Sequence, residues 1–212
     1  MEILERIAVA LQRGDEQQVG SLVAEALGAG LAAGEVLQGG LVAGMDVVGE
    51  QFRVREIFLP DVLLAARAMY AGLGLLEPRL ASEGVARRGK VVLGTVKGDL
   101  HDIGKNLVGI LLKGAGFEVI DLGHDVSPEA FVDAALREGA PLIGLSALLT
   151  TTMPRMREVV ELLKQRGLAG RVRTIVGGAP VSDAFAREIG ADDYACDAAR
   201  AVERVKALLG AA

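Results

Sequence analysis

Beyond residue 88, short apolar runs alternate with longer segments whose apolar positions recur at a helical period, and this alternation most constrains the fold. Short continuous apolar runs are typical of strands buried on both faces of a sheet. Runs that alternate with helical segments are typical of strand–helix–strand units, which build a parallel sheet. We therefore predict an α/β domain with a five-stranded parallel sheet over residues 89–212. The expected strands are residues 91–96, 117–122, 141–145, 172–176 and, more weakly, 193–195.

Residues 1–88 follow a different pattern. Their apolar residues recur at steps of three and four, which is typical of amphipathic helices. Polar or glycine-containing breaks separate the segments, and Pro60 suits the first turn of the last one. Four helices with short connections predict an antiparallel four-helix bundle. The expected helices are residues 3–11, 19–27, 36–52 and 59–76, and residues 81–89 are the expected linker between domains 1–88 and 89–212.

Composition limits the setting in which the chain works. With no Trp, two Tyr and five Phe, the core must be mainly aliphatic, and a net charge of −5 argues against a general nucleic-acid binder. Cys196 is the one cysteine, which excludes an internal disulfide and fits a reducing compartment; we assign it no role. The acidic amino terminus does not resemble a signal peptide, and the longest uncharged apolar segment, residues 141–154, is shorter than the roughly 20 residues that span a bilayer. We expect a soluble, cytoplasmic protein with no membrane partner.

Three motifs stand at the carboxyl ends of expected strands. Residues 99–104 read Asp-Leu-His-Asp-Ile-Gly after the first strand, residues 146–148 read Ser-Ala-Leu at the third, and residues 177–178 are both glycine after the fourth. The carboxyl ends of parallel strands meet at one edge, where ligands bind in open α/β sheets. A neutral imidazole such as that of His101 binds metals, and a nearby carboxylate such as Asp99 fixes its tautomer. The motifs therefore predict one ligand site.

In this order and spacing, Asp-x-His-x-x-Gly, Ser-x-Leu and Gly-Gly resemble the cobalamin-binding module of methionine synthase and of the methyltransferase corrinoid proteins. The resemblance covers residues 90–210, and residues 1–88 resemble the helical cap that precedes the module in that family. It implies a Rossmann-like (flavodoxin-like) sheet domain behind a four-helix cap. It also implies a cobalamin cofactor, as methylcobalamin or a related corrinoid, with its cobalt.

The resemblance also implies roles for individual residues. His101 would be the lower ligand of cobalt, Asp99 would accept its other ring N–H, and Thr152, six positions after Ser146, would extend this chain as a proton relay. These three are the expected catalytic residues, and His101 is the expected metal ligand. A proton taken up by the His–Asp pair as cobalt gains electrons would ease release of the imidazole.

The displaced nucleotide tail of the cofactor would enter a slot in the sheet domain. Gly104, Gly177 and Gly178 would leave room for it, and the Ser146 hydroxyl would bind a ring nitrogen; ordinary turn glycines and a core serine are the other interpretation. The positions to which the resemblance assigns cofactor contacts are Asp99, His101, Asp102, Ile103, Gly104, Ser146, Leu148, Thr150, Gly177, Gly178, Phe52 and Leu59.

Two of these positions lie in the bundle. The family motif Gly-x-x-Phe, followed by a short loop and Phe-Leu-Pro, matches residues 49–52 and 58–60. It implies that Phe52 and Leu59 cover the upper face of the corrin, where an apolar lid protects the metal from water and oxygen. A plain core position is the alternative for both residues.

Three further residues lie near the motifs. Lys105 and Asn106 resemble the family sequence Gly-Lys-Asn and would touch a corrin amide. For His124, after the second strand, both a contact with the cofactor rim and a solvated loop position fit the sequence.

We expect a freestanding carrier of a methyl group, cycling between Co(I) and methyl-Co(III). Its expected partners are a substrate-specific methyltransferase, an acceptor methyltransferase and a reductive activator. After the cofactor residues are assigned, the sequence offers no second group of convergent acids, bases or nucleophiles, so we expect a subunit of a methyltransferase system rather than a complete enzyme.

Three other functions remain open. A cobalamin-dependent sensor uses the same two domains but usually carries a helix-turn-helix, for which residues outside the cap leave no room. A metal hydrolase using Asp99, His101 and Asp102 would need more ligands than His124, the other histidine, supplies. An adenosylcobalamin mutase subunit shares the three motifs but usually lacks the bundle.

Overall fold

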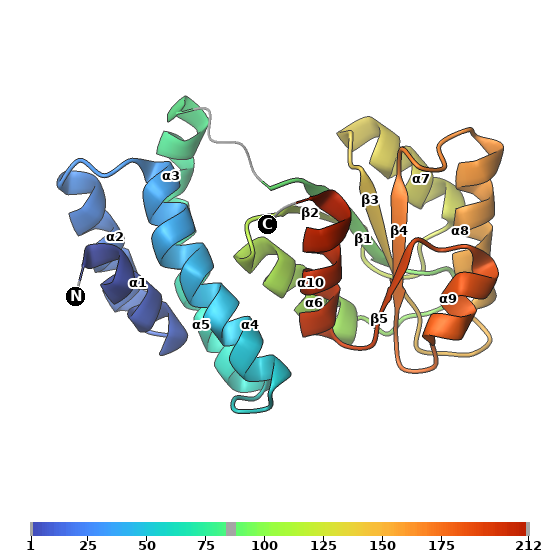
Figure 1. Ribbon diagram of the computed structural model, residues 1–212, viewed down its shortest axis with the longest axis horizontal. Coiled ribbons are helices and arrows are strands. Elements are labelled where there is room, and N and C mark those ends of the chain that lie inside the picture. The colour runs from blue at the N-terminus through green and yellow to red at the C-terminus, as the bar shows by residue number, and fades with distance from the viewer. Residues whose placement is uncertain (1, 84–87, 211–212) are drawn as a thin grey trace. The chain divides into compact units, whose positions relative to one another are not determined.

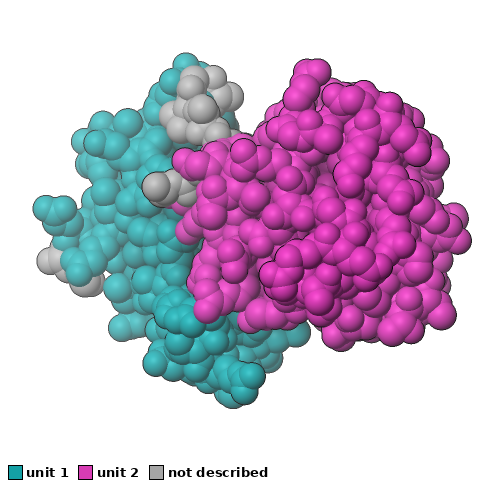
Figure 2. Space-filling view, turned by 45° about the vertical axis from the view of Figure 1, so that its right-hand side comes forward, with its two compact units in different colours: residues 1–86, 114–116 teal, residues 87–113, 117–212 magenta. Residues whose placement is uncertain are grey.

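The computed structural model describes residues 2–83 and 88–210. The chain forms two compact units, residues 1–86 with 114–116 and residues 87–113 with 117–212, which Figure 2 shows in different colours. Of the linker predicted at residues 81–89, residues 84–87 lie outside the described part of the chain.

The first unit is helical, as predicted, and its helices follow one another along the chain with short connections (Figure 1). The predicted third helix is built from three segments, because a π-helical stretch, η1, stands between α3 and α4. Sequence analysis did not predict this stretch. The helical elements described in residues 2–83 are α1 (Ile3–Gln12), α2 (Glu16–Gly28), α3 (Ala33–Val36), η1 (Leu37–Val42), α4 (Ala43–Arg53) and α5 (Leu59–Glu83).

Close packing of α1 explains why the η1 segment contains glycines. A Cβ on Gly39 would lie 3.0 Å from the Leu4 side chain, and a Cβ on Gly40 would lie 3.0 Å from that of Ile7. Both distances are shorter than ordinary van der Waals contacts, so the Leu4 and Ile7 side chains would have to shift by a few tenths of an ångström to admit a Cβ. Ile7 is fully buried at this contact, which places part of the bundle core between α1 and η1.

Helix α5 is the longest element and packs against α2. Its stretch from residue 59 to residue 80 has a mean hydropathy of 1.4 and is long and apolar enough to cross a membrane, a test that core helices of soluble proteins also pass. It is not an uncharged run, because residues such as Arg67 interrupt it. Its buried side is apolar and faces the bundle, and the absence of a membrane partner stays a prediction. The buried hydrophobic residues of α5 are Val62, Ala65, Ala66, Ala68, Met69 and Leu76.

The second unit contains the predicted five-stranded sheet, with every pair of neighbouring strands parallel. The strand order is β2-β1-β3-β4-β5, which is the flavodoxin-like order. Helices α6 and α10 lie on one face of the sheet, and α7, α8 and α9 lie on the other (Figure 1). The strands are β1 (Lys90–Thr95), β2 (Glu118–Asp121), β3 (Leu142–Ser146), β4 (Arg173–Gly177) and β5 (Asp193–Ala195), and the helices are α6 (Ile103–Gly114), α7 (Pro128–Glu138), α8 (Pro154–Gln165), α9 (Asp183–Ile189) and α10 (Ala198–Leu209).

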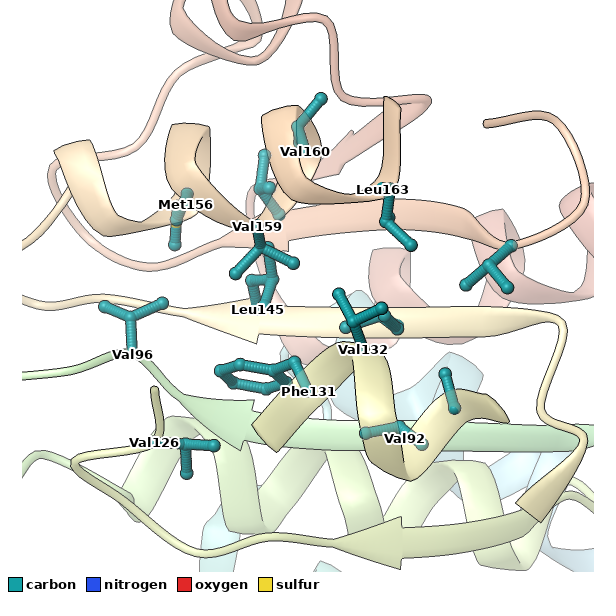
Figure 3. Close-up of a cluster of buried hydrophobic side chains, with 14 of the residues drawn as sticks. Val92, Val96, Val126, Phe131, Val132, Leu145, Met156, Val159, Val160 and Leu163 are labelled. Atoms are coloured by element: carbon teal, nitrogen blue, oxygen red, sulfur yellow. The ribbon is translucent and has the colours of Figure 1, made fainter. Parts of the chain in front are cut away.

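The core between the sheet and α7 and α8 is aliphatic, as composition predicts, with one aromatic ring at its centre (Figure 3). Phe131 of α7 is fully buried there. A Cβ on Gly94 of β1 would lie 2.7 Å from two ring atoms of Phe131, so the ring rests directly on the backbone of β1. This contact sets the distance between α7 and the strand that leads into the Asp-x-His motif.

We predict that Gly94→Ala lowers the free energy of unfolding by about 1–3 kcal/mol, the usual effect of forcing a carbon atom into a packed core. Gly109→Ala is the control. Gly109 lies in helix α6, and its Cβ would make an ordinary 3.4 Å contact with the Leu93 side chain of β1. Urea denaturation measures both variants, through the midpoint at an unchanged slope. Equal midpoints for Gly94→Ala and the natural chain would contradict the packing argument.

Candidate functional site

The three motifs meet at the carboxyl edge of the sheet. Thr95 ends β1 and pairs with Ser146 at the end of β3, and Ser146 pairs in turn with Gly177 at the end of β4. The strand order reverses between β1 and β3, and ligands bind at such switch points in open α/β sheets. The loops after β1 and β3 therefore form a site at the expected edge.

The carboxylate of Asp99 lies at the centre of this edge and is fully buried. One oxygen, Oδ1, is 2.7 Å from Nδ1 of His101 and accepts the His101 backbone N–H at 3.1 Å. The other oxygen, Oδ2, accepts the N–H groups of Leu148 and Leu149 at 2.8 and 3.2 Å and the Thr152 hydroxyl at 2.8 Å. The structure thus brings Asp99, His101 and Thr152 into one hydrogen-bonded chain and ties together the loops that carry them.

These hydrogen bonds keep Asp99 ionised. Burial by itself raises the pKa of Asp99, but the hydrogen bonds from the His101 ring, the Leu148 and His101 N–H groups and the Thr152 hydroxyl outweigh it and hold this pKa well below its ordinary value. A carboxylate can only accept, so the neutral imidazole donates to it from Nδ1. Nε2 of His101 is then the nitrogen with a lone pair for a metal, on a side chain that is 52% exposed.

Four large apolar side chains are exposed in the segments that carry the motifs. Two flank His101 in the loop after β1 and at the start of α6, and two lie in the loop after β3. Exposed apolar side chains that gather at one place mark binding surfaces. Sequence analysis named Ile103 and Leu148 as cofactor contacts. It did not name Leu100 and Leu149, because no sequence pattern reveals that these two side chains are exposed. The exposed fractions are 67% for Leu100, 75% for Ile103, 42% for Leu148 and 40% for Leu149.

Two matches with family models cover both units. A B12 binding domain model matches residues 89–205, and a second B12 binding domain model matches residues 3–77. A corrinoid protein of Desulfitobacterium hafniense strain Y51 is 46% identical over an alignment of 213 positions, which covers 99% of each chain. Dimethylamine corrinoid protein 1 of Methanosarcina acetivorans is 46% identical over 210 residues, 98% of each chain.

The chain is a member of the B12-binding corrinoid protein family. Solved structures agree with this assignment. The methanol:cobalamin methyltransferase complex of Methanosarcina barkeri gives a TM-score of 0.88 at 32% identity, over 99% of this chain and 80% of that chain. A cobalamin-binding protein of Desulfitobacterium hafniense DCB-2 gives a TM-score of 0.80 at 35% identity, over 97% and 98%.

The residues of this corrinoid protein fit the cofactor of its family, cobalamin with its cobalt. His101 offers Nε2 from an oriented ring, and the exposed apolar side chains suit the face of a large macrocycle. A Cβ on Gly104 would meet nothing within 4 Å, so the backbone there borders open space. Among the described residues, no group of three or more His, Cys, Asp or Glu side chains is placed to hold a bare metal ion.

The paired glycines have a reason in packing that sequence analysis did not foresee. A Cβ on Gly178 would lie 1.9 Å from the carbonyl oxygen of Ala147, and the residue has a φ of 132°. A Cβ on Gly177 would lie 3.0 Å from the carbonyl oxygen of Ala195. The fold therefore requires glycine at Gly178 even without a ligand, and their predicted role in the slot for the tail stays a prediction.

Some of the remaining predicted positions in the sheet domain have no side-chain hydrogen-bond partner among the described residues, and others are already hydrogen-bonded within the protein. Ser146 is partly buried at the end of β3, and Thr150 is exposed in the loop that follows. Asp102 precedes α6, and its carboxylate accepts the Asn106 amide at 3.1 Å. The Lys105 ammonium, implied to touch a corrin amide, instead has its three donors occupied by Asp121 and Asn106 within the protein.

His124 and the bundle residues complete the set. His124 is exposed, next to Asp125, whose carboxylate accepts the Gly98 N–H at 2.8 Å. In the first unit Phe52 and Leu59 are partly exposed rather than fully buried. Both side chains therefore retain a surface for a further contact.

We predict that Thr152→Val destabilises the cofactor-free protein by roughly 1–3 kcal/mol, because it removes a hydrogen bond to a buried charge. Thr152→Ser keeps the hydroxyl and is the matched control. Urea denaturation followed by circular dichroism compares the three proteins. Should the valine variant prove as stable as the natural chain, the Thr152 hydroxyl would not support Asp99.

Proposed function

We propose that this corrinoid protein carries a methyl group on cobalt from a substrate-specific methyltransferase to an acceptor methyltransferase. When bound, the cofactor supplies the cobalt that takes up the methyl group as Co(I) and holds it as methyl-Co(III). The names of the relatives support this role, since they include dimethylamine and trimethylamine corrinoid proteins and a methanol:cobalamin methyltransferase complex. The observation that carries the proposal is an imidazole oriented by a buried carboxylate at an exposed apolar edge.

In this role His101 would hold the cobalt of the cofactor through Nε2. Asp99 accepts the Nδ1–H and holds the ring plane, and Thr152 holds Asp99 from the opposite side. Such outer partners raise the donor strength of a metal-binding imidazole. The three residues act as one hydrogen-bonded unit, in which His101 touches the metal and the other two orient it.

The remaining contacts follow the slot predicted from the motifs. We assign Asp102, Ile103 and Leu148 to the rim of the macrocycle, and Gly104, Ser146 and Thr150 to the path of the nucleotide tail beside Gly177 and Gly178. The open space beside Gly104 supports this path. The hydroxyl of Ser146 stands at the strand end beside Gly177, where a buried ring nitrogen of the tail would need a donor.

We assign the cap role to residues 1–88 and cofactor binding to residues 89–212. The family models at residues 3–77 and 89–205 support this division. Phe52 and Leu59 would cover the upper face of the corrin, and the cap would move aside when a methyltransferase reaches the metal. A reductive activator would return oxidised cobalt to the carrier state, and the cytoplasm would be the site of the reaction.

We predict that His101→Ala still binds methylcobalamin but changes its absorption spectrum from the base-on to the base-off form. The apolar edge and the slot remain in this variant, whereas the lower ligand is lost. His124→Ala is the control, because it removes an exposed histidine from a neighbouring loop. A base-on spectrum in His101→Ala would show that another group ligates the metal.

We predict that Phe52→Ala and Leu59→Ala accelerate photolysis of the bound methylcobalamin, because water and oxygen gain access to the upper face. Leu75→Ala removes an apolar side chain that is 46% exposed elsewhere in the bundle and serves as control. The rate of spectral change under constant illumination is the measurement. If all three variants match the natural chain, Phe52 and Leu59 form no lid.

The carrier role itself is tested by mixing the reduced, cobalamin-loaded protein with a methylamine or methanol methyltransferase and its substrate. The expected result is conversion to the methylated spectrum only when enzyme and substrate are both present. Protein that binds cobalamin but is not methylated by any such enzyme would refute the carrier role and leave cofactor binding intact.

A further inference from the structure

The loop that carries His101 is held by side chains outside the Asp99–His101–Thr152 chain. Thr95, the last residue of β1, is fully buried, and its hydroxyl donates to the backbone carbonyl of His101 at 3.0 Å. Its own N–H donates to the carbonyl of Gly123 at 2.9 Å. The backbone of Thr95 is therefore held by a contact outside the loop that its hydroxyl supports.

On the other side of His101, a buried cation fixes the start of α6. The Lys105 side chain is 1% exposed, and its ammonium donates to both carboxylate oxygens of Asp121, at 2.7 and 2.6 Å, and to Oδ1 of Asn106 at 2.6 Å. Asp121 ends β2 and also accepts the N–H of Gly123 at 2.9 Å. The first turn of α6 is thus anchored to the neighbouring strand by an ion pair.

Stability alone does not explain this choice of residues. A buried lysine is rare, and an apolar residue of similar volume often stabilises a fold as well as a buried ion pair does. Unlike an apolar side chain, a hydroxyl or an ammonium forms directional hydrogen bonds, which fix the positions of the acceptor atoms that they contact. Direction matters where a ligand atom must be held within about 0.5 Å of its working position.

We propose that Thr95 and Lys105, the latter through Asp121, are positioning residues that hold the His101 loop in its metal-binding conformation before the cofactor arrives. Thr95 fixes the backbone at His101 itself, and Lys105 fixes the chain four residues later. The two contacts leave the imidazole to rotate only about its own side-chain bonds, where Asp99 orients it. The link to the metal rests on the proposed function, whereas the ordering of the loop does not.

Matched variants separate this role from simple stability. Thr95→Val keeps the shape and removes the donor, and Thr95→Ser keeps the donor. Lys105→Met removes the ammonium. Asp121→Asn removes the charge of its partner, whose side chain is more exposed than that of Lys105. Lys113→Met is the control, because it makes the same change as Lys105→Met at an exposed position of the same helix. Asp121→Asn also keeps the test available if Lys105→Met fails to fold.

The first measurement is amide hydrogen exchange in the cofactor-free protein. Amides of residues 100–106 should exchange roughly three- to tenfold faster in Thr95→Val, Lys105→Met and Asp121→Asn, since each loses about one hydrogen bond or ion pair. Thr95→Ser and Lys113→Met should exchange like the natural chain. Unchanged exchange in the first three variants would overturn the proposal.

The second measurement is the spectrum after loading with methylcobalamin. The base-on fraction should fall in Thr95→Val, Lys105→Met and Asp121→Asn while the cofactor stays bound, and it should return in Thr95→Ser. Faster amide exchange with an unchanged base-on fraction would show that Thr95 and Lys105 only stabilise the loop, and it would also overturn the proposal. If His101→Ala keeps a base-on spectrum, the metal-binding role of His101 fails, and the exchange result still decides whether the loop is held.

Discussion

The buried carboxylate of Asp99 is the interaction on which the rest of the site depends. It is fully buried and accepts hydrogen bonds from His101, Leu148, Leu149 and Thr152. A buried charge is tolerated only when its oxygens are satisfied, so the loops after β1 and β3 must be in place together. The hydrogen bonds that satisfy the Asp99 carboxylate thus hold the two loops together at the edge of the sheet and orient the His101 imidazole. Sheet topology brings the two loops together, and Asp99 determines how they pack.

The sequence predicted the elements better than the contacts between them. Five strands could be found because buried parallel strands are continuous apolar runs, and the Asp-x-His motif is local enough to read directly. The partners of Thr95 and Lys105 could not be found, because Lys105 and Asp121 are sixteen positions apart and meet only when β2 pairs with β1. The π-helical segment was missed because one wider turn barely changes the apolar period.

Glycines show where a residue type alone misleads. Gly177 and Gly178 were interpreted as space for a ligand, yet at Gly178 the backbone leaves no room for any Cβ. Gly104 is the opposite case, since nothing in the described protein would contact its Cβ. Gly104 is exposed, and several other glycines of this chain also have open space where a Cβ would stand. Packing at Gly104 therefore leaves room for the proposed nucleotide tail without requiring it.

The chemistry of the site also indicates what this protein must obtain from others. Removing a methyl group from an amine or an alcohol requires a group that activates the leaving nitrogen or oxygen, by protonation or by a metal ion. The described edge offers apolar side chains and one imidazole, whose Nδ1 is committed to Asp99. Among the described residues, no group of three or more His, Cys, Asp or Glu side chains is placed to hold a metal ion that could activate the leaving group. In the carrier role proposed above, the methyltransferase partner brings both the methyl donor and the group that activates it, so we expect substrate specificity to lie in the partner.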